Sequence, residues 1–258
     1  MIYIVFLVFT FLVLSIVFYQ GQYFLIFSPT YYRKEKLGAD CEMLSIMSDD
    51  GIELEGVVYE PWNATQTLLV FTGRKHDSVG LIEKLSLAYP KVCIVTFNYR
   101  SYGKSQGRAN EKNLLKDSLK IGQMVQKHYG DFAVLGFSLG AHVATYLASQ
   151  QKVKALFLIG AFDSFPALLK SKIGIDVSKI VRYELNTEKY MKEVALPTYI
   201  FASKDDEVVD AQNVRVLKDS VKFLAHFEET SGVRHDKLMF DERIVKQINK
   251  VFDDKKIV

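Results

Sequence analysis

Short apolar runs alternate with helix-length amphipathic segments through most of this 258-residue chain, and this alternation constrains its fold more than any other feature. The runs cover residues 67–73, 92–99, 132–136, 153–160, 198–203 and 222–228. Between them, segments such as residues 111–130 place leucine and methionine near one helical face. Strands that alternate with helices form a mostly parallel, twisted sheet with helices on both faces. We therefore expect one α/β domain, which a chain of this length accommodates.

The first strands of this sheet are expected to form a β-hairpin. Strand-like sequence lies on both sides of Asp49-Asp50-Gly51, where glycine suits the positive φ of a tight turn. An antiparallel edge therefore opens the predicted sheet. The chain has no internal repeat and no proline-rich linker that would divide the domain.

An uncharged apolar segment precedes the domain. Residues 1–32 contain no charged side chain, and the run over residues 2–19 is long enough to cross a bilayer as a helix. No basic residue precedes this run and no small-residue cleavage site follows it, which favours an uncleaved anchor over a signal peptide. A helix that is apolar on every face is also hard to bury in a domain of this size. We predict a transmembrane anchor over residues 1–21 and an α/β domain over residues 22–258.

The residues that follow the apolar run indicate how it would sit in a bilayer. Aromatic residues typical of the membrane interface are Tyr19, Tyr23, Phe24, Phe27, Tyr31 and Tyr32. Arg33, Lys34 and Lys36 lie on the domain side, so the positive-inside rule favours a cytoplasmic domain. The glycosylation sequon Asn63-Ala64-Thr65 would be used only in a lumenal domain. The side of the membrane stays open at this point.

Charge and cysteine content exclude some classes of function. The formal net charge is +3, from 33 basic and 30 acidic residues, and no block of lysine and arginine suggests a nucleic-acid partner. Cys41 and Cys93 do not have the spacing of metal ligands, and we expect both to be free thiols.

The sequence Gly136-Phe137-Ser138-Leu139-Gly140 lies between an apolar strand and a predicted helix. Glycines two residues before and two after the serine relieve crowding where the chain turns sharply from strand to helix. A serine that only caps a helix does not require both glycines. Ser138 is therefore the candidate nucleophile, and it needs a base and a carboxylate that orients this base.

His235 is the best-placed base, because it lies in the loop between the last predicted strand and the final helix. Three histidines, His128, His142 and His226, fall within predicted helices or a strand and have structural explanations. His76 follows an early strand and is the remaining candidate for a position in the site, although it precedes Ser138 in the chain.

The candidate acid follows the penultimate strand. Asp206 is our choice, Asp205 is its nearest competitor, and Asp163, beyond the preceding strand, is a weaker alternative. The resulting order along the chain is serine, aspartate, histidine, which is the order of α/β-hydrolases rather than of chymotrypsin-like or subtilisin-like enzymes.

With these motifs in place, the chain resembles α/β-hydrolase-fold serine hydrolases of the kind anchored by one N-terminal span, a group that includes protein depalmitoylases and monoacylglycerol or lysophospholipid lipases. The resemblance covers about residues 22–254. Besides the serine motif it is carried by "MSDDGIELEGVVYEP", "LLVFTGRKHD", "FNYRSYGKSQG", "ASKDDEVV" and "GVRHDK".

Two stretches depart from the family pattern. Where the family usually has His-Gly-Asn-Ala, this chain has Thr72-Gly73-Arg74-Lys75, and Ser101 stands where a loop usually carries glycine. The resemblance implies an oxyanion hole made by the backbone N–H groups of Leu139 and, by position, Arg74. Arg74 and Lys75 would also bring positive charge to the site if their side chains point inward, which would favour an acidic head group.

The expected reaction is acyl transfer to water from an ester or thioester, on a lipid or acyl-protein substrate at a membrane. It uses Ser138, His235 and Asp206 and needs no metal or organic cofactor. The 37 residues between two of the predicted strands, 161–197, leave room for one or two helices over the site. The alternatives are a serine aminopeptidase, a carboxylesterase for small esters, and a non-catalytic scaffold of the same fold.

Overall fold

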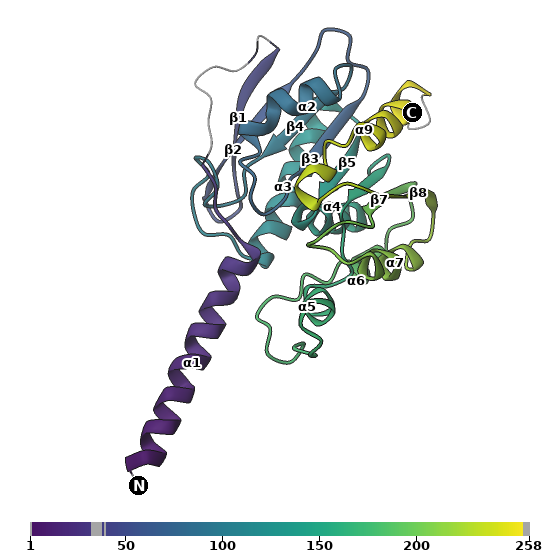
Figure 1. The fold of residues 1–258 in the computed structure, drawn as a ribbon. Coiled ribbons are helices and arrows are strands. Elements are labelled where there is room, and N and C mark those ends of the chain that lie inside the picture. The colour runs from purple at the N-terminus through teal and green to yellow at the C-terminus, as the bar shows by residue number, and fades with distance from the viewer. Residues whose placement is uncertain (1, 32–37, 39, 255–258) are drawn as a thin grey trace.

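A single mixed sheet forms the centre of the domain in the computed structural model, which describes residues 2–31, 38 and 40–254. Among these residues, eight strands pair in the order β1-β2-β4-β3-β5-β6-β7-β8 (Figure 1). The strands are β1 Cys41–Met47, β2 Glu53–Tyr59, β3 Thr67–Phe71, β4 Cys93–Phe97, β5 Phe132–Phe137, β6 Leu156–Ile159, β7 Thr198–Ser203 and β8 Leu224–Thr230.

The sheet is parallel from β4 to β8 and antiparallel at its β1 edge. β1 pairs antiparallel with β2, and β2 pairs antiparallel with β4. All other neighbours pair parallel, so the carboxyl ends of these strands meet along one edge of the sheet. The turn between β1 and β2 contains Gly51 at a φ of 77°. The predicted hairpin and the mostly parallel sheet are therefore confirmed.

Helices cover both faces of the sheet. They are α2 Ile82–Ala88, α3 Glu111–Tyr129, α4 Leu139–Gln150, α5 Phe165–Ile173, α6 Thr187–Met191, α7 Ala211–Asp219, α8 His235–Leu238 and α9 Glu242–Asp253, with a 3₁₀ turn at Val79–Leu81, whereas α1 Ile2–Ile26 lies mostly outside the sheet. The buried residues of α2, α8 and α9 share one hydrophobic cluster, and those of α3 to α7 share the cluster on the opposite face. In α9 the buried residues Ile244, Ile248, Val251 and Phe252 form the single apolar stripe expected of a helix that packs on a sheet.

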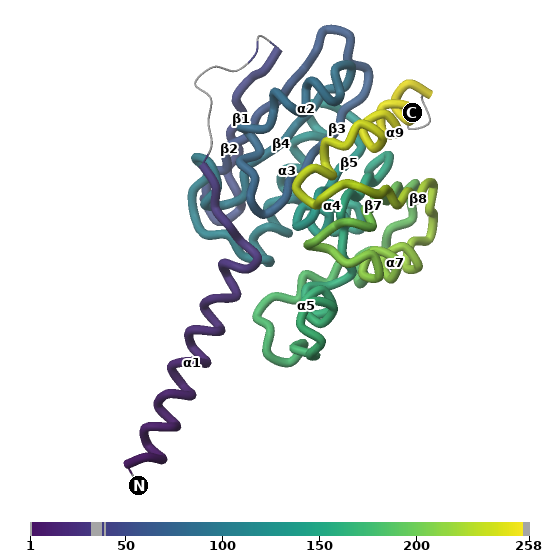
Figure 2. The backbone as a smooth tube through the Cα atoms, viewed as in Figure 1, coloured from purple at the N-terminus to yellow at the C-terminus, as the bar shows by residue number. Residues whose placement is uncertain are grey.

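Helix α1 projects away from the domain over most of its length (Figure 2). It is long and apolar enough to cross a bilayer, with a mean hydropathy of 2.7 in its most apolar window and none of that window buried. Burial begins at Gln22, and the helix continues past residue 21 to Ile26. Tyr23 and Phe27, which the sequence placed at or near the membrane interface, pack in the domain core, so neither side chain is free to contact lipid. Tyr32, Arg33, Lys34 and Lys36 lie outside the described residues.

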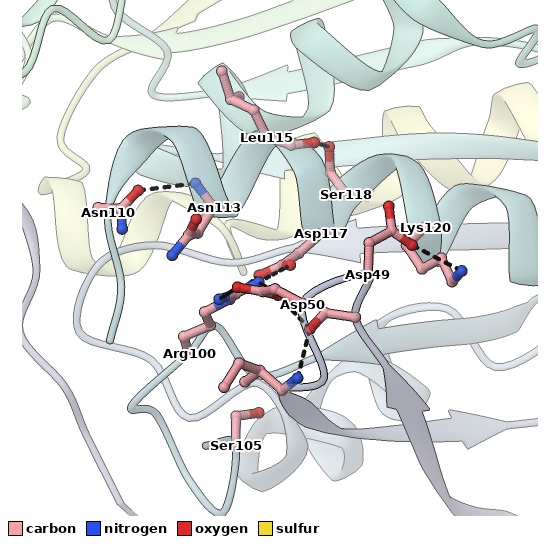
Figure 3. Close-up of polar contacts among 12 residues, drawn as sticks. Asp49, Asp50, Arg100, Ser105, Asn110, Asn113, Leu115, Asp117, Ser118 and Lys120 are labelled. Atoms are coloured by element: carbon pink, nitrogen blue, oxygen red, sulfur yellow. Dashed lines mark hydrogen bonds and ion pairs between the residues drawn. The ribbon is translucent and has the colours of Figure 1, made fainter. Parts of the chain in front are cut away.

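An ion-pair network, buried at Arg100 and Asp117 and exposed at Asp50, joins the β1–β2 turn, the loop after β4 and helix α3 (Figure 3). The Arg100 guanidinium donates to both carboxylate oxygens of Asp50, at 2.7 and 2.6 Å, and to both of Asp117, at 2.8 and 2.7 Å. These hydrogen bonds lower the pKa of Asp50 far below its usual range. Burial raises the pKa of Asp117, and the Arg100 guanidinium opposes that shift. The network therefore fixes the loop after β4, which reaches the site through Tyr102.

Ser101, in the same loop, has a φ of 65°. This left-handed conformation favours glycine and is strained for other residues. The loop therefore keeps a glycine-like backbone at the position where the family pattern usually has glycine.

Candidate active site

Ser138 lies at the turn between β5 and α4, with φ 54° and ψ −116°. This conformation is unfavourable for a residue with a side chain, and such strain persists only where the surrounding structure enforces it. A Cβ atom on Gly136 would lie 2.5 Å from the backbone of Gly140 and Ala141, and one on Gly140 would overlap the backbone of Phe71 in β3. Both glycines are needed because α4 starts in close contact with the ends of two strands.

Ser138, His235 and Asp206 form a chain of hydrogen bonds at the carboxyl edge of the sheet. The Nε2 atom of His235 lies 2.9 Å from the Ser138 Oγ, and its Nδ1 atom lies 2.7 Å from Asp206 Oδ2. All three residues are less than one-tenth exposed. The other oxygen of Asp206 accepts the backbone N–H groups of Val208 and Val209, both at 2.8 Å.

The two alternative acids bind elsewhere. Asp205 accepts the backbone N–H of Gly232 at 2.6 Å, in an exposed loop. Asp163 accepts from the Asn213 amide at 2.9 Å, and burial raises the pKa of its carboxyl. The structure thus brings Asp206, and neither Asp205 nor Asp163, to His235.

Three neighbours whose contacts the sequence did not predict surround His235, two at its ring and one at its backbone. Its ring stacks on Phe137, with ring centroids 5.0 Å apart. Gly160, at the end of β6, has a φ of 56°, and a Cβ there would lie 3.1 Å from the His235 Cε1. Glu207 accepts the backbone N–H of His235 at 3.1 Å. The pKa of the Glu207 carboxyl is lowered by hydrogen bonds from backbone N–H groups, first from that of Glu207 itself and then from that of His235.

His76 lies beside the site but does not contact Ser138 through a hydrogen bond. Its ring stacks on Phe137 at 5.6 Å, and its Nδ1 atom accepts the Gly73 N–H at 3.3 Å. Burial lowers the pKa of His76 to about 4, and the charge on His235 adds to this shift. The other histidines are remote or bound: His128 is exposed, His142 contacts Thr187, and His226 contacts Glu228.

The two residues proposed as oxyanion donors line the same cavity as Ser138. Leu139 is the first residue of α4, and Arg74 lies in the loop after β3. Within the described part of the chain, neither backbone N–H donates a hydrogen bond. The Tyr102 hydroxyl donates to the Arg74 carbonyl at 2.7 Å, which fixes this loop. The Arg74 guanidinium does not point at the serine, since it donates to the Leu25 and Phe24 carbonyls in the last turn of α1.

A cavity of about 560 Å³ opens beside Ser138 and His235. Its apolar lining comes from the end of α1, the loop after β6, and α5: Leu25, Ile26, Phe162, Phe165, Leu168 and Leu169. Lys75, Lys172 and Arg234 add positive charge, and Glu207 and Asp236 add negative charge. Over the described residues, no group of three or more metal-ligating side chains is present. The site therefore consists of a serine hydroxyl that is hydrogen-bonded to a histidine and faces a mostly apolar cavity.

Comparisons with known proteins agree with the fold. A family model described as "alpha/beta hydrolase fold" matches residues 71–178. The lysophosphatidylserine lipase ABHD12 of Danio rerio is 25% identical over an alignment 177 residues long, and the match covers 55% of this chain and 45% of that protein. The chain therefore aligns with somewhat less than half the length of this curated relative.

Solved structures match over most of the chain. The Pyrococcus furiosus esterase Pf2001 has a TM-score of 0.69 at 15% identity, covering 89% of this chain and 97% of that one. An acetyl xylan esterase from Paenibacillus sp. R4 has a TM-score of 0.68 at 12% identity, covering 85% and 86%. At these identities the likeness is one of fold.

Proposed function

This chain has the α/β-hydrolase fold, and we propose that it is a membrane-anchored serine hydrolase that cleaves ester or thioester bonds of acyl or lipid substrates. The observation that carries the proposal is the pair of hydrogen bonds that links Ser138 to His235 and His235 to Asp206. A serine hydroxyl becomes a nucleophile when a base accepts its proton and a carboxylate orients that base.

The proposed reaction proceeds through an acyl-enzyme. Ser138 Oγ attacks the carbonyl carbon while His235 Nε2 takes its proton, and Asp206 stabilises the imidazolium. The N–H groups of Leu139 and Arg74 stabilise the oxyanion. His235 then protonates the leaving alcohol or thiol, and a water molecule activated by the same histidine releases the acid.

The cavity supports an acyl substrate. Its apolar wall suits a hydrocarbon chain, and Leu25 and Ile26 bring the end of α1 into that wall. Lys75 and Lys172 line the same cavity, and their charge favours an anionic head group, whereas the Arg234 guanidinium is ion-paired with Glu207 and Asp236. The relative in Danio rerio is named for an anionic lysolipid, which agrees with this preference.

Activity-based labelling tests the proposal. The full-length protein in detergent should react with a fluorophosphonate probe, whereas Ser138→Ala and His235→Ala should not. Asp206→Asn should slow labelling by orders of magnitude, because the imidazole loses its orienting carboxylate. Asp205→Asn is the matched control and should label like the wild type, since Asp205 binds Gly232 instead. A wild-type protein that stays unlabelled beside an active serine hydrolase would rule the proposal out.

Substrate panels then separate the reaction classes. Turnover of long-chain lysophospholipids or acyl-cysteine peptides supports the proposal. Turnover confined to peptide amides would indicate an aminopeptidase, and turnover confined to short esters would indicate a carboxylesterase. Absence of both labelling and turnover would point to a scaffold.

We propose a cytoplasmic domain, on the basis of the basic residues that follow the apolar run. Asn63 is exposed and so is available to a glycosyltransferase if the domain is lumenal. Translation into microsomes tests this: a glycosylated product that disappears in Asn63→Gln would place the domain in the lumen. An unglycosylated product that resists added protease would point the same way, and digestion of the domain would support the cytoplasmic side.

A further inference from the structure

The segment from α5 through the loop that follows it, residues 165–182, exposes large apolar side chains; we call it the α5 segment. Ile173, Ile175 and Ile180 are 54%, 64% and 58% exposed. Leaving several isoleucines in water forgoes a large part of the free energy that burial of their surface would provide. Such a group of exposed apolar side chains marks a surface that contacts another apolar phase.

The α5 segment is fastened to α1 at the point where this helix leaves the domain. The buried side chain of Gln22 donates to the Ile180 carbonyl at 3.1 Å and accepts the Arg182 N–H at 2.6 Å. The Tyr183 ring packs edge-on against Phe27, with centroids 5.4 Å apart. The α5 segment therefore lies on the side of the domain from which α1 projects, as Figure 1 shows.

Basic residues surround these isoleucines. Lys170, Lys172 and Lys179 are exposed, and the Arg182 guanidinium lies 4.9 Å from the centre of the Tyr19 ring on α1. Asp176 is the one acidic residue among positions 165–182. Apolar side chains bordered by lysine and arginine match the boundary between acyl chains and anionic head groups.

We propose that the α5 segment is a second membrane contact, in which Ile173, Ile175 and Ile180 insert into the bilayer that α1 spans. This inference rests on the membrane anchor that forms part of the proposed function. The cavity lies between the two contacts, because Leu25 and Ile26 of α1 and Leu168 and Leu169 of α5 line it. An acyl chain would then enter the cavity from the bilayer without crossing bulk water.

Tryptophan fluorescence in vesicles with bromine on the acyl chains tests the contact. Trp62 is the sole tryptophan, so Trp62→Phe gives a tryptophan-free protein into which single tryptophans can be placed in the full-length chain. Ile175→Trp and Ile180→Trp report on the α5 segment, and Phe11→Trp reports on α1. Leu87→Trp is the matched control, since Leu87 is 81% exposed on α2, which packs on the opposite face of the sheet.

We expect blue-shifted, bromine-quenched emission for Phe11→Trp, Ile175→Trp and Ile180→Trp, and neither effect for Leu87→Trp. Quenching of Phe11→Trp with unquenched emission from positions 175 and 180 would overturn the inference and leave the anchor standing. An unquenched Phe11→Trp would overturn both. Fluorophosphonate labelling of the same variants reports separately on the proposed hydrolase.

Activity provides a second readout. The triple variant Ile173→Ser, Ile175→Ser and Ile180→Ser should reduce hydrolysis of a long-chain ester in phosphatidylserine-containing vesicles by about tenfold or more. Hydrolysis of a water-soluble short-chain ester should stay at the wild-type rate, and Leu87→Ser should change neither activity. A triple variant with wild-type activity on the vesicle substrate would contradict the proposal.

Discussion

Gly160→Ala should misplace His235 and slow catalysis while the fold survives. A methyl group at Gly160 would lie 3.1 Å from the His235 Cε1 and 3.3 Å from its Nδ1, so the ring must move by a few tenths of an ångström. The ring cannot move freely, because Phe137 stacks on it. A displacement of 1 Å in a catalytic group costs about 10²-fold in rate, so this smaller shift should cost about four- to tenfold in kcat. KM should change little, since Gly160 does not line the cavity.

The matched control is Gly51→Ala. Gly51 also has positive φ, 77° against 56° at Gly160, but a Cβ at Gly51 meets nothing within 4 Å. Both variants should lose about 1 kcal/mol of unfolding free energy from backbone strain, a fall of about 2–4 °C in Tm. Only Gly160→Ala should slow turnover of a chromogenic ester. Equal kcat values for the two variants would refute the contact between Gly160 and His235 as a constraint on the site.

Three further outcomes are expected. Ser101→Gly should raise the free energy of unfolding by about 0.5 kcal/mol in chemical denaturation, because relief of the strain at a φ of 65° outweighs the greater chain entropy of glycine in the unfolded state. Ser101→Ala keeps the strain and should give no gain. Arg100→Met should lower the unfolding free energy by about 3–5 kcal/mol, since it leaves the buried Asp117 carboxylate unpaired, and adding Asp117→Leu should recover part of the loss. The pKa of His76 is lowered from 6.5 to about 4, so between these two pH values the unfolded chain binds a proton more readily than the folded one. The unfolding free energy of the wild type should therefore fall as the pH drops from about 6.5 to 4. In His76→Phe the midpoint of chemical denaturation should depend less on pH over this range.

Hydrophobic periodicity was enough to predict the architecture of the sheet. Five of the apolar runs correspond to β3 to β7, which are buried along their whole length because a sheet covered on both faces requires continuous apolar strands there. The predicted turn at Gly51 joins β1 to β2. The serine motif located the sharp turn at Ser138 for a similar reason, since only glycine fits at positions 136 and 140.

Contacts between distant segments were beyond sequence reasoning. Asp205 and Asp206 are adjacent and chemically identical, and the choice between them depends on how the loop folds back to give one carboxylate the N–H groups of Val208 and Val209. Gly160 lies 75 positions before His235, and its local sequence gives no indication that it contacts the His235 imidazole. The direction of the Arg74 side chain likewise depends on where α1 ends.

The junction between α1 and the domain limits how the protein can be shortened for study. Because Tyr23, Ile26 and Phe27 belong to the core and Leu25 and Ile26 line the cavity, removal of the first 27 residues would strip away part of the substrate wall together with the carbonyl partners of Arg74. A soluble form cut at this position would report the selectivity of an altered enzyme. Replacing residues 1–21 with the transmembrane segment of another protein, joined directly before Gln22, would preserve these contacts. The cavity wall would then stay native although the membrane-spanning sequence has changed.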